Sequence, residues 1–138
     1  MTERLFLDSS ALLRRYVADR HRPMVIEAMT QAADWAVSAL ARTELQLALV
    51  QASISARDRD RFWSSVRDDW DAFWQVPVDA RCLARATEIG AQFGLNLVDA
   101  THLAAADRLP RPLRYVTFER QQIPAAAELG MHVISPWE

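Results

Sequence analysis

Residues 4–8 read Arg-Leu-Phe-Leu-Asp, a short apolar run that ends directly in a carboxylate. A run of this length, followed at once by helical patterning, is typical of a buried strand in an α/β protein. A second run of the same kind, Tyr-Val-Thr-Phe-Glu at residues 115–119, places Glu119 after its strand much as Asp8 follows the first. In an open parallel sheet, ligands bind beyond the carboxyl ends of the strands, so both acids are candidates for a functional site.

Strands alternate with helices along the rest of the chain. The expected strands are Arg4–Leu7, Trp35–Ser38, Trp74–Val78, Tyr115–Thr117 and His132–Ile134, and the expected helices are Ser9–Val17, Met24–Gln31, Leu40–Ile54, Arg57–Phe73, Asp79–Phe93, Asn96–Arg108 and Glu119–Leu129. This alternation predicts an α/β fold with a parallel sheet covered by helices on both faces. With 138 residues and neither a linker nor an internal repeat, we expect a single domain over residues 1–138.

The composition excludes several classes of protein. All 16 basic residues are arginine, they stand against 18 acidic residues, and the net charge of −2 argues against a generically basic nucleic-acid binder. The absence of lysine excludes P-loop hydrolases, Schiff-base enzymes, kinases and phospho-receiver domains. The lone Cys82 cannot form an internal disulfide, which suits the reducing cytoplasm. No apolar run reaches the ~18 residues of a membrane helix, and the first residues do not resemble a signal peptide.

Asp8 and Glu44 each have a structural and a functional interpretation. Asp8 stands where it can cap the helix that follows, a role that Asp performs well. Glu44 projects from the apolar arc of its helix, within about 60° of Leu40, Leu47 and Ala48 on a helical wheel. A buried carboxylate without a partner costs several kcal/mol. Glu44 therefore requires either an arginine from elsewhere in the fold or a bound metal ion.

Asp99 and Glu119 are open to the same two interpretations. Asn96 is a good helix cap, and Asp99 three residues later completes a capping-box-like pair. Asp99 also shares a helical face with the apolar Leu103, so it projects along the packed side of the helix. Glu119 is either a helix-start acid favoured by the helix dipole or a fourth site carboxylate. His102 is expected to be packed or hydrogen-bonded rather than to act as a base.

The coincidence of four such carboxylates favours the functional interpretation. Carboxylates crowded at one site repel each other and raise their pKa values unless cations are present. Oxygen-only ligands select hard cations such as Mg²⁺ or Mn²⁺. Such an ion holds phosphate oxygens and lowers the pKa of a bound water, which is the chemistry of phosphodiester hydrolysis. The sequence therefore predicts a Mg²⁺- or Mn²⁺-dependent site.

Several stretches resemble the PIN domain family, in particular the VapC-like ribonuclease toxins of type II toxin–antitoxin systems. They are Leu7–Leu12, Ala41–Leu45, Leu97–Ala104 and Val116–Arg120 followed by Ala126–Gly130, and they occur in the family's order over nearly the whole chain. The Asp-Ala-Thr-His-Leu-Ala stretch at residues 99–104 is the most diagnostic of them. The resemblance implies a three-layer α/β/α domain with a central parallel sheet.

The resemblance also implies roles for particular residues. Asp8, Glu44 and Asp99 are expected in an acidic site, with Asp8 and Asp99 as direct metal ligands and Ser10 beside the metal. The family commonly has Asp where this chain has Glu119, so a role of Glu119, like that of Glu44, is expected to run through water. The implied reaction is endonucleolytic hydrolysis of RNA by an activated water, leaving 5′-phosphate and 3′-hydroxyl ends.

The chain also carries candidate contacts to RNA and to a protein partner. Arg14 and Arg15, on the helix after Asp8, are either phosphate contacts or part of an ordinary solvated face. Large apolar residues form a stripe in and just after the helix at residues 57–73, namely Phe62, Val66, Trp70 and Phe73, with Trp63 and Trp74 alongside. The stripe is either core or a partner surface. Because toxins of this family are held by an antitoxin segment in an apolar groove, we expect an antitoxin, and a homodimer to which this helix contributes.

Two other functions stay open. One is a catalytically silent PIN-like module that only binds RNA or protein, which the replacement of Asp by Glu119 favours. The other is a different Mg²⁺-dependent phosphohydrolase. A haloacid-dehalogenase-like phosphatase, however, needs Asp-x-Asp after the first strand and a lysine, whereas this chain has Ser10 at the third position and no lysine.

Overall fold

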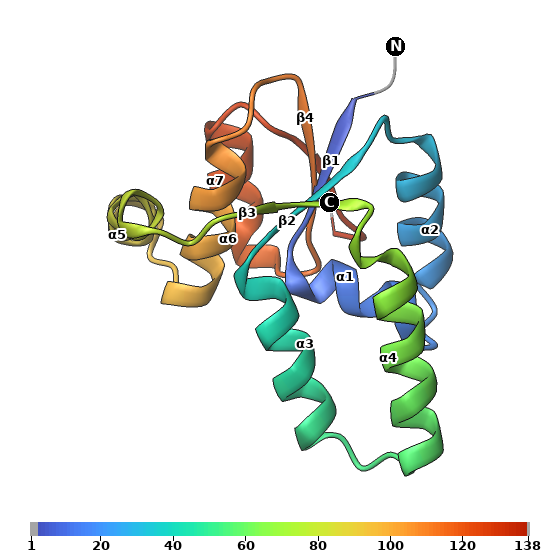
Figure 1. The fold of residues 1–138 in the computed structure, drawn as a ribbon. Helices are drawn as coiled ribbons and strands as arrows, with labels where there is room; N and C mark the ends of the chain where they lie inside the picture. The colour runs from blue at the N-terminus through green and yellow to red at the C-terminus, as the bar shows by residue number, and fades with distance from the viewer. Residues whose placement is uncertain (1–2, 138) are drawn as a thin grey trace.

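Five short strands pair in parallel in the order β3-β2-β1-β4-β5 (Figure 1). The structure is a computed structural model that describes residues 3–137. The strands are β1 Arg4–Leu7, β2 Trp35–Ser38, β3 Phe73–Val76, β4 Leu113–Val116 and β5 His132–Ile134. The α/β class and the parallel sheet expected from the sequence are therefore confirmed.

The strand order reverses at the centre of the sheet. From β1 the chain moves outward to β2 and β3, and then crosses back to place β4 on the other side of β1. Leu7, the last residue of β1, lies in register with Val116, the last residue of β4. The residues that follow these two strands thus emerge next to each other at a topological switch point, where open α/β sheets bind their ligands.

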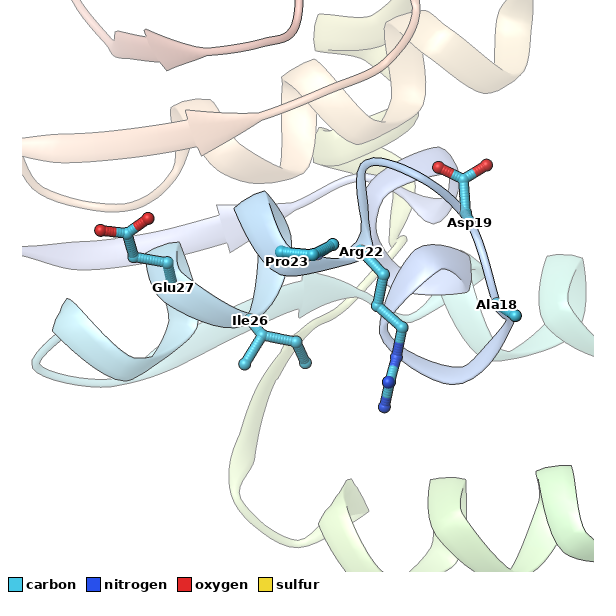
Figure 2. Close-up of a pocket in the computed structure, with 6 residues that line it drawn as sticks. All are labelled: Ala18, Asp19, Arg22, Pro23, Ile26 and Glu27. Carbon is cyan, nitrogen blue, oxygen red and sulfur yellow. The ribbon is translucent and has the colours of Figure 1, made fainter.

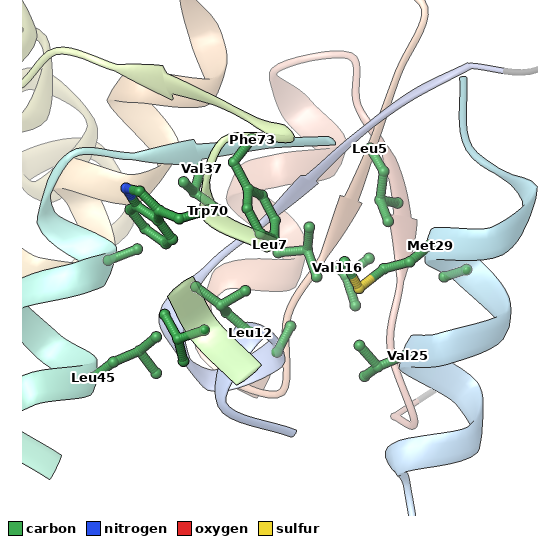
Figure 3. Close-up of a cluster of buried hydrophobic side chains, with 14 of the residues drawn as sticks. Leu5, Leu7, Leu12, Val25, Met29, Val37, Leu45, Trp70, Phe73 and Val116 are labelled. Atoms are coloured by element: carbon green, nitrogen blue, oxygen red, sulfur yellow. The ribbon is translucent and has the colours of Figure 1, made fainter. Parts of the chain in front are cut away.

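Helices cover both faces of the sheet and make the fold three-layered. One face carries α1 Ser9–Tyr16, α2 Arg22–Gln31, α3 Leu40–Gln51 and α4 Ala56–Trp70, and the other carries α5 Ala80–Phe93, α6 Leu97–Asp107 and α7 Ile123–Glu128 (Figure 1). Successive side chains of a strand point to opposite faces. Leu5 and Leu7 accordingly enter the first core, which Figure 3 shows around Leu12 and Trp70, while Phe6 enters the second.

The aromatic stripe is used mainly for the core. Phe62, Val66 and Trp70 on α4 and Phe73 at the start of β3 are all buried in the first core. The expected helix to Phe73 and strand from Trp74 are wrong in their boundary, because Trp70 ends α4 and Phe73 begins β3. Because these side chains are buried, they are not available for the expected contact with a partner. Trp74, on the edge strand β3, is the strongly exposed member of the stripe.

Two other helix ends differ from expectation. The expected helix at residues 119–129 divides into a short 3₁₀-helix, η1 Arg120–Gln122, followed by α7. The helix expected to run to Ile54 ends at Gln51. The expected helix end at Phe93 is confirmed, because the next residue, Gly94, adopts a left-handed φ of 66° that favours glycine at a helix end. Within residues 3–137 no helix combines the length and the apolar character needed to cross a membrane.

Candidate active site

Three donors hold Asp8 at the end of β1. Its Oδ1 atom accepts hydrogen bonds from the Ser10 hydroxyl at 2.7 Å and from the Ala11 backbone N–H at 2.9 Å, and its Oδ2 atom accepts one from the Thr117 hydroxyl at 2.6 Å. The bond from Ala11 caps α1, so the helix-capping interpretation is confirmed. The bond from Thr117, directly after β4, also ties Asp8 to the switch point, so one carboxylate takes part in both arrangements.

Asp8 lacks a compensating positive charge. Burial raises the pKa of its carboxyl above the ordinary value, and the neighbouring His102 and the hydroxyls of Thr117 and Ser10 offset only part of that effect. Among the ion pairs formed by residues 3–137, none joins Asp8 to an arginine. The ionised form of a buried carboxylate is costly without such a partner. A bound cation would supply the missing charge.

Glu44 reaches from α3 to His102 on α6. Its Oε1 atom accepts a hydrogen bond from His102 Nε2, so the partner that Glu44 requires is an imidazole rather than the arginine considered from the sequence. The Ser38 hydroxyl, at the end of β2, lies 3.1 Å from Nδ1 of the same ring, and the Ser9 hydroxyl lies 3.4 Å from Nε2. His102 is 1% exposed. It is packed and hydrogen-bonded, as expected, and it fixes the direction of Glu44.

Asp99 receives two side-chain amides. The Gln121 amide donates to its Oδ2 at 2.9 Å, and the Gln122 amide donates to its Oδ1 at 2.8 Å. Asn96 caps α6 by accepting from the Asp99 backbone N–H at 2.8 Å, so that half of the capping-box interpretation is confirmed. The Asp99 carboxylate itself faces η1, across the space beyond β4.

Glu119 stands at the start of η1 without capping it. Its backbone N–H donates to the Thr117 hydroxyl at 3.0 Å, the same hydroxyl that donates to Asp8. Its Oε2 atom accepts a hydrogen bond from the Gln121 amide at 3.2 Å. Glu119 thus lies at a helix start, as one interpretation expected, although its side chain makes no cap bond. It is also connected to Asp8 through Thr117 and to Asp99 through Gln121.

The four predicted carboxylates thus belong to one neighbourhood built by four separate segments of the chain. Three of them act on the buried Tyr115 hydroxyl. Burial raises the pKa of Tyr115 well above its ordinary value, and the charges of Asp8, Asp99 and Glu44 raise it further. Tyr115 lies on β4 beside the switch point and donates to the Gln122 side-chain oxygen at 2.6 Å. The acidic network, as we call Asp8, Glu44, Asp99 and Glu119 together, is a product of the topology.

The donor chemistry of the acidic network fits a hard divalent cation. Its members are all carboxylates, the ligands that Mg²⁺ and Mn²⁺ prefer, and the buried Asp8 lacks a charge partner. Hydroxyls and amides now separate them: within residues 3–137, no three side chains of His, Cys, Asp or Glu already lie close enough together to hold an ion. Asp8 and Asp99 are the members that would hold it, with Glu44 and Glu119 behind.

The two candidate phosphate contacts separate in the structure. Arg14 lies beside the network: it donates to the Ser10 backbone carbonyl at 2.8 Å, and its guanidinium lies 4.1 Å from the centre of the Phe118 ring. The Arg15 side chain instead lies against α4, where its guanidinium forms an ion pair with Asp69 at 2.8 Å. Arg14 also pairs with Asp19 at 3.5 Å, but its contacts to Ser10 and Phe118 keep it next to Asp8, whereas Arg15 contacts α4.

Sequence reasoning missed the residues that orient the carboxylates. Thr117, Gln121 and Gln122 each donate to Asp8 or Asp99, and Tyr115 in turn orients Gln122. The two glutamines that follow Arg120 were a signal, since paired amides next to a strand end can orient neighbouring carboxylates. Their function only becomes visible once β4 is placed next to β1.

A pocket on the surface at the start of α2 lies apart from this network. It is lined by Ala18, Asp19, Arg22, Pro23, Ile26 and Glu27 (Figure 2). None of these residues makes a side-chain hydrogen bond to a member of the acidic network in the described part of the chain. We assign no function to it.

Known proteins match this chain over almost its full length. The sequence matches the PIN domain family over residues 5–128. It is 36% identical over 145 residues to Ribonuclease VapC46 of Mycobacterium tuberculosis, and the alignment covers 96% of this chain and 97% of that protein. The fold is similar to that of a toxin–antitoxin complex from Klebsiella pneumoniae, with a TM-score of 0.71 and 17% identity, covering 97% of this chain and 98% of that one.

A further structural match is VapBC-5 of Mycobacterium tuberculosis, from the VapBC family of toxin–antitoxin systems. The TM-score is 0.66 with 18% identity, and the match covers 96% of this chain and 98% of that one. The chain belongs to the PIN-domain family. Its resemblance to the VapC-like ribonucleases is thereby confirmed, together with the expected three-layer fold.

Proposed function

We propose that this protein is a metal-dependent endoribonuclease and the toxin of a type II toxin–antitoxin pair. The observation that carries the proposal is the acidic network near the switch point of the sheet: Asp8 and Glu119 share the Thr117 hydroxyl, Glu119 and Asp99 share the Gln121 amide, and Glu44 is held by the nearby His102. No arginine of residues 3–137 forms an ion pair with any of them. The relationship to a protein named as a ribonuclease supports RNA as the substrate.

Each member of the network then has a role. Asp8 and Asp99 would hold the cation, Mg²⁺ or Mn²⁺, which when bound would neutralise phosphate charge and make water a stronger nucleophile. Ser10 keeps the Asp8 carboxylate in position through its hydrogen bond. Glu44, held by His102, orients a water molecule, and Glu119 takes part through water. The attacking oxygen then comes from water, so the products carry 5′-phosphate and 3′-hydroxyl ends.

Two arginine–aromatic pairs flank the turn that follows β4 and suit a single RNA strand. Arg14 lies over Phe118, and the Arg120 guanidinium lies 4.5 Å from the centre of the Trp137 ring. The Trp137 indole N–H donates to the Phe118 carbonyl at 2.9 Å, which fixes the ring beside the turn. Arginine binds phosphates, and an exposed ring such as Trp137 can stack on an unpaired base, whereas the buried Phe118 ring serves to support Arg14. These residues are proposed to hold the RNA on either side of the cleaved bond.

A titration of RNA cleavage with metal tests the function. The purified full-length chain is incubated with single-stranded RNA over a range of Mn²⁺ and Mg²⁺ concentrations, with EDTA as the control and Asp99→Asn as the matched inactive variant. Cleavage that depends on the metal, is lost with Asp99→Asn and leaves 5′-phosphate ends supports the proposal. RNA binding without cleavage at any metal concentration would instead support the silent binding module.

We further propose an antitoxin as the protein partner. A groove of about 550 Å³ lies between the end of α1, the second half of α3 and the first half of α4. Its apolar lining includes Leu13, Val17, Leu49 and Phe62, which suits the apolar face of a helical segment. Two structurally similar proteins were solved as, or named for, toxin–antitoxin complexes.

Co-purification with the product of the neighbouring reading frame tests this partner. Ala48 lines the groove, so Ala48→Arg is expected to abolish co-purification, whereas Arg81→Ala on α5 is the distant control. If the Ala48→Arg variant still co-purifies with the partner, the partner binds outside this groove. We also propose a homodimer, measured by sedimentation, and a cytoplasmic location, which suits an RNA substrate and the free thiol of the buried Cys82.

A further inference from the structure

Two consecutive glutamines, Gln121 and Gln122, bind the same carboxylate. The Gln121 amide donates to Asp99 Oδ2 at 2.9 Å, and the Gln122 amide donates to Asp99 Oδ1 at 2.8 Å. Both residues come from η1, so a single short segment supplies a neutral donor to each oxygen of Asp99. The proposed reaction does not use either amide.

The two amides differ in their freedom to move. Gln122 is 1% exposed, and its side-chain oxygen accepts a hydrogen bond from the buried Tyr115 hydroxyl at 2.6 Å. This bond decides which end of the amide faces Asp99 and fixes the side chain in place. Gln121 is exposed at the surface. Its side chain can therefore leave without opening the core.

Gln121 also bridges two members of the acidic network. Its amide nitrogen lies 2.9 Å from Asp99 Oδ2 and 3.2 Å from Glu119 Oε2. An amide nitrogen has two hydrogens, one for each carboxylate. Its partial positive charge reduces the repulsion between the two anions, as a divalent cation does more strongly. The amide thus occupies one oxygen of Asp99, a residue that would hold the cation, and one oxygen of Glu119, which is proposed to act through water.

We propose that Gln121 is a displaceable substitute for the cation and weakens divalent-ion binding, whereas Gln122 is a positioning residue that preorganises Asp99 and strengthens it. The inference rests on the proposed function, because it concerns the same metal site. An ion that binds must first separate the Gln121 amide from Asp99 and Glu119. Gln121 thereby shifts the cation concentration at which the site fills.

Direct measurement of Mn²⁺ binding tests the two opposite effects. Isothermal titration calorimetry with MnCl₂ alone, without RNA, is performed on the full-length wild type, Gln121→Ala and Gln122→Met. Since the net contribution of one hydrogen bond is modest, Gln121→Ala is expected to tighten binding by about 3- to 10-fold. Gln122→Met, which keeps the length of the side chain but removes its donor, is expected to weaken binding by about 10-fold.

Two further variants serve as controls. Gln92→Ala removes an exposed glutamine from α5, away from the network, and is expected to leave the Kd for Mn²⁺ unchanged. If Gln122→Met does not fold in thermal unfolding, Tyr115→Phe replaces it, because it removes the hydroxyl that orients Gln122 while keeping the ring stacked on Phe6. Tyr115→Phe is then expected to weaken Mn²⁺ binding by about 3-fold.

The outcomes separate this inference from the proposed function. Tighter binding by Gln121→Ala together with weaker binding by Gln122→Met or Tyr115→Phe supports the inference. Unchanged or weaker binding by Gln121→Ala overturns the role of Gln121, and unchanged binding by the Gln122 and Tyr115 variants overturns the role of Gln122. A wild type that binds no Mn²⁺ overturns the metal site itself, and this is seen before any variant is compared.

Discussion

Asp69 and the acidic network show two ways of holding carboxylates in one small fold. Asp69 on α4 accepts hydrogen bonds from the Arg15 guanidinium at 2.8 Å and from the Tyr16 hydroxyl at 2.9 Å. Burial, which raises the pKa of Asp69, is outweighed by these two donors and by the charge of Arg15, so the pKa is lowered. This carboxylate is charge-paired and joins α4 to α1.

Asp8 and Asp99 of the acidic network are held by neutral groups instead. Hydroxyls hold Asp8, amides hold Asp99, and Asp8 has a raised pKa because it is buried. The chain has 16 arginines, so neutral donors in the network are not explained by a shortage of cationic side chains. Carboxylates that stabilise the fold are paired within the chain, whereas those at the switch point keep an uncompensated charge that suits a cation.

The largest expected effect comes from removing a charge in the acidic network. Asp8→Asn and Asp99→Asn are each expected to lower the rate of Mn²⁺-dependent RNA cleavage by more than about 100-fold, since each removes a proposed direct ligand at nearly unchanged shape. Asp8→Asn is also expected to raise the melting temperature at neutral pH, because a buried charge is removed. Cleavage at the wild-type rate by either variant would show that the site is wrongly placed.

The next effect concerns the histidine that holds Glu44. His102→Asn keeps a polar group near Ser38 but loses the donor to Glu44, and is expected to slow cleavage by about 10- to 100-fold. His102→Gln extends an amide toward Glu44 in place of Nε2 and is expected to retain most of the rate. Rates are compared at saturating metal, after thermal unfolding has shown both variants to be folded. Equal loss in both variants would mean that His102 serves packing alone.

A smaller effect is expected at Glu119. Glu119→Gln removes a charge that acts through water, so it is expected to slow cleavage less than Asp99→Asn does, and Glu119→Asp, the commoner residue in the family, is expected to be tolerated. The cleavage rate is measured against Mn²⁺ concentration for all three variants. The same metal dependence in the wild type and in Glu119→Gln would reduce the site to Asp8, Glu44 and Asp99.

The smallest effect on cleavage is expected from substitution of Asp69, which should lower the stability of the fold rather than the cleavage rate. Asp69→Asn is expected to lower the free energy of unfolding at pH 7 by about 1 kcal/mol, since the pair with Arg15 is only partly shielded from water. Because the folded-state pKa is lowered, this stabilisation is present above the ordinary pKa of Asp and is lost as the pH falls through the folded-state value. Denaturant unfolding at pH 7 and pH 3 measures it. If the folded Asp69→Asn variant cleaves RNA more slowly than the wild type, Asp69 is not purely structural and the distinction from the acidic network is wrong.

The sequence by itself determined the class of the fold and the identity of the four carboxylates. Short apolar runs and helical patterns depend on neighbours only a few residues apart, so the alternation of strands and helices was visible locally. The end of α4 was not, because Phe73 has the same apolar character whether it closes a helix or begins a strand. Tertiary pairing of β3 with β2 decided that boundary.

Only the tertiary structure decided how the carboxylates are held. Glu44 requires a partner on any helical wheel, but that the partner is His102, 58 residues away, follows from the packing of α3 and α6 near the end of β2. Gln121 and Gln122 reach Asp99 because β4 crosses back to lie beside β1. Residue types reveal which charges a chain carries; the contacts that compensate those charges, or leave them for a cation, arise between segments far apart in the sequence.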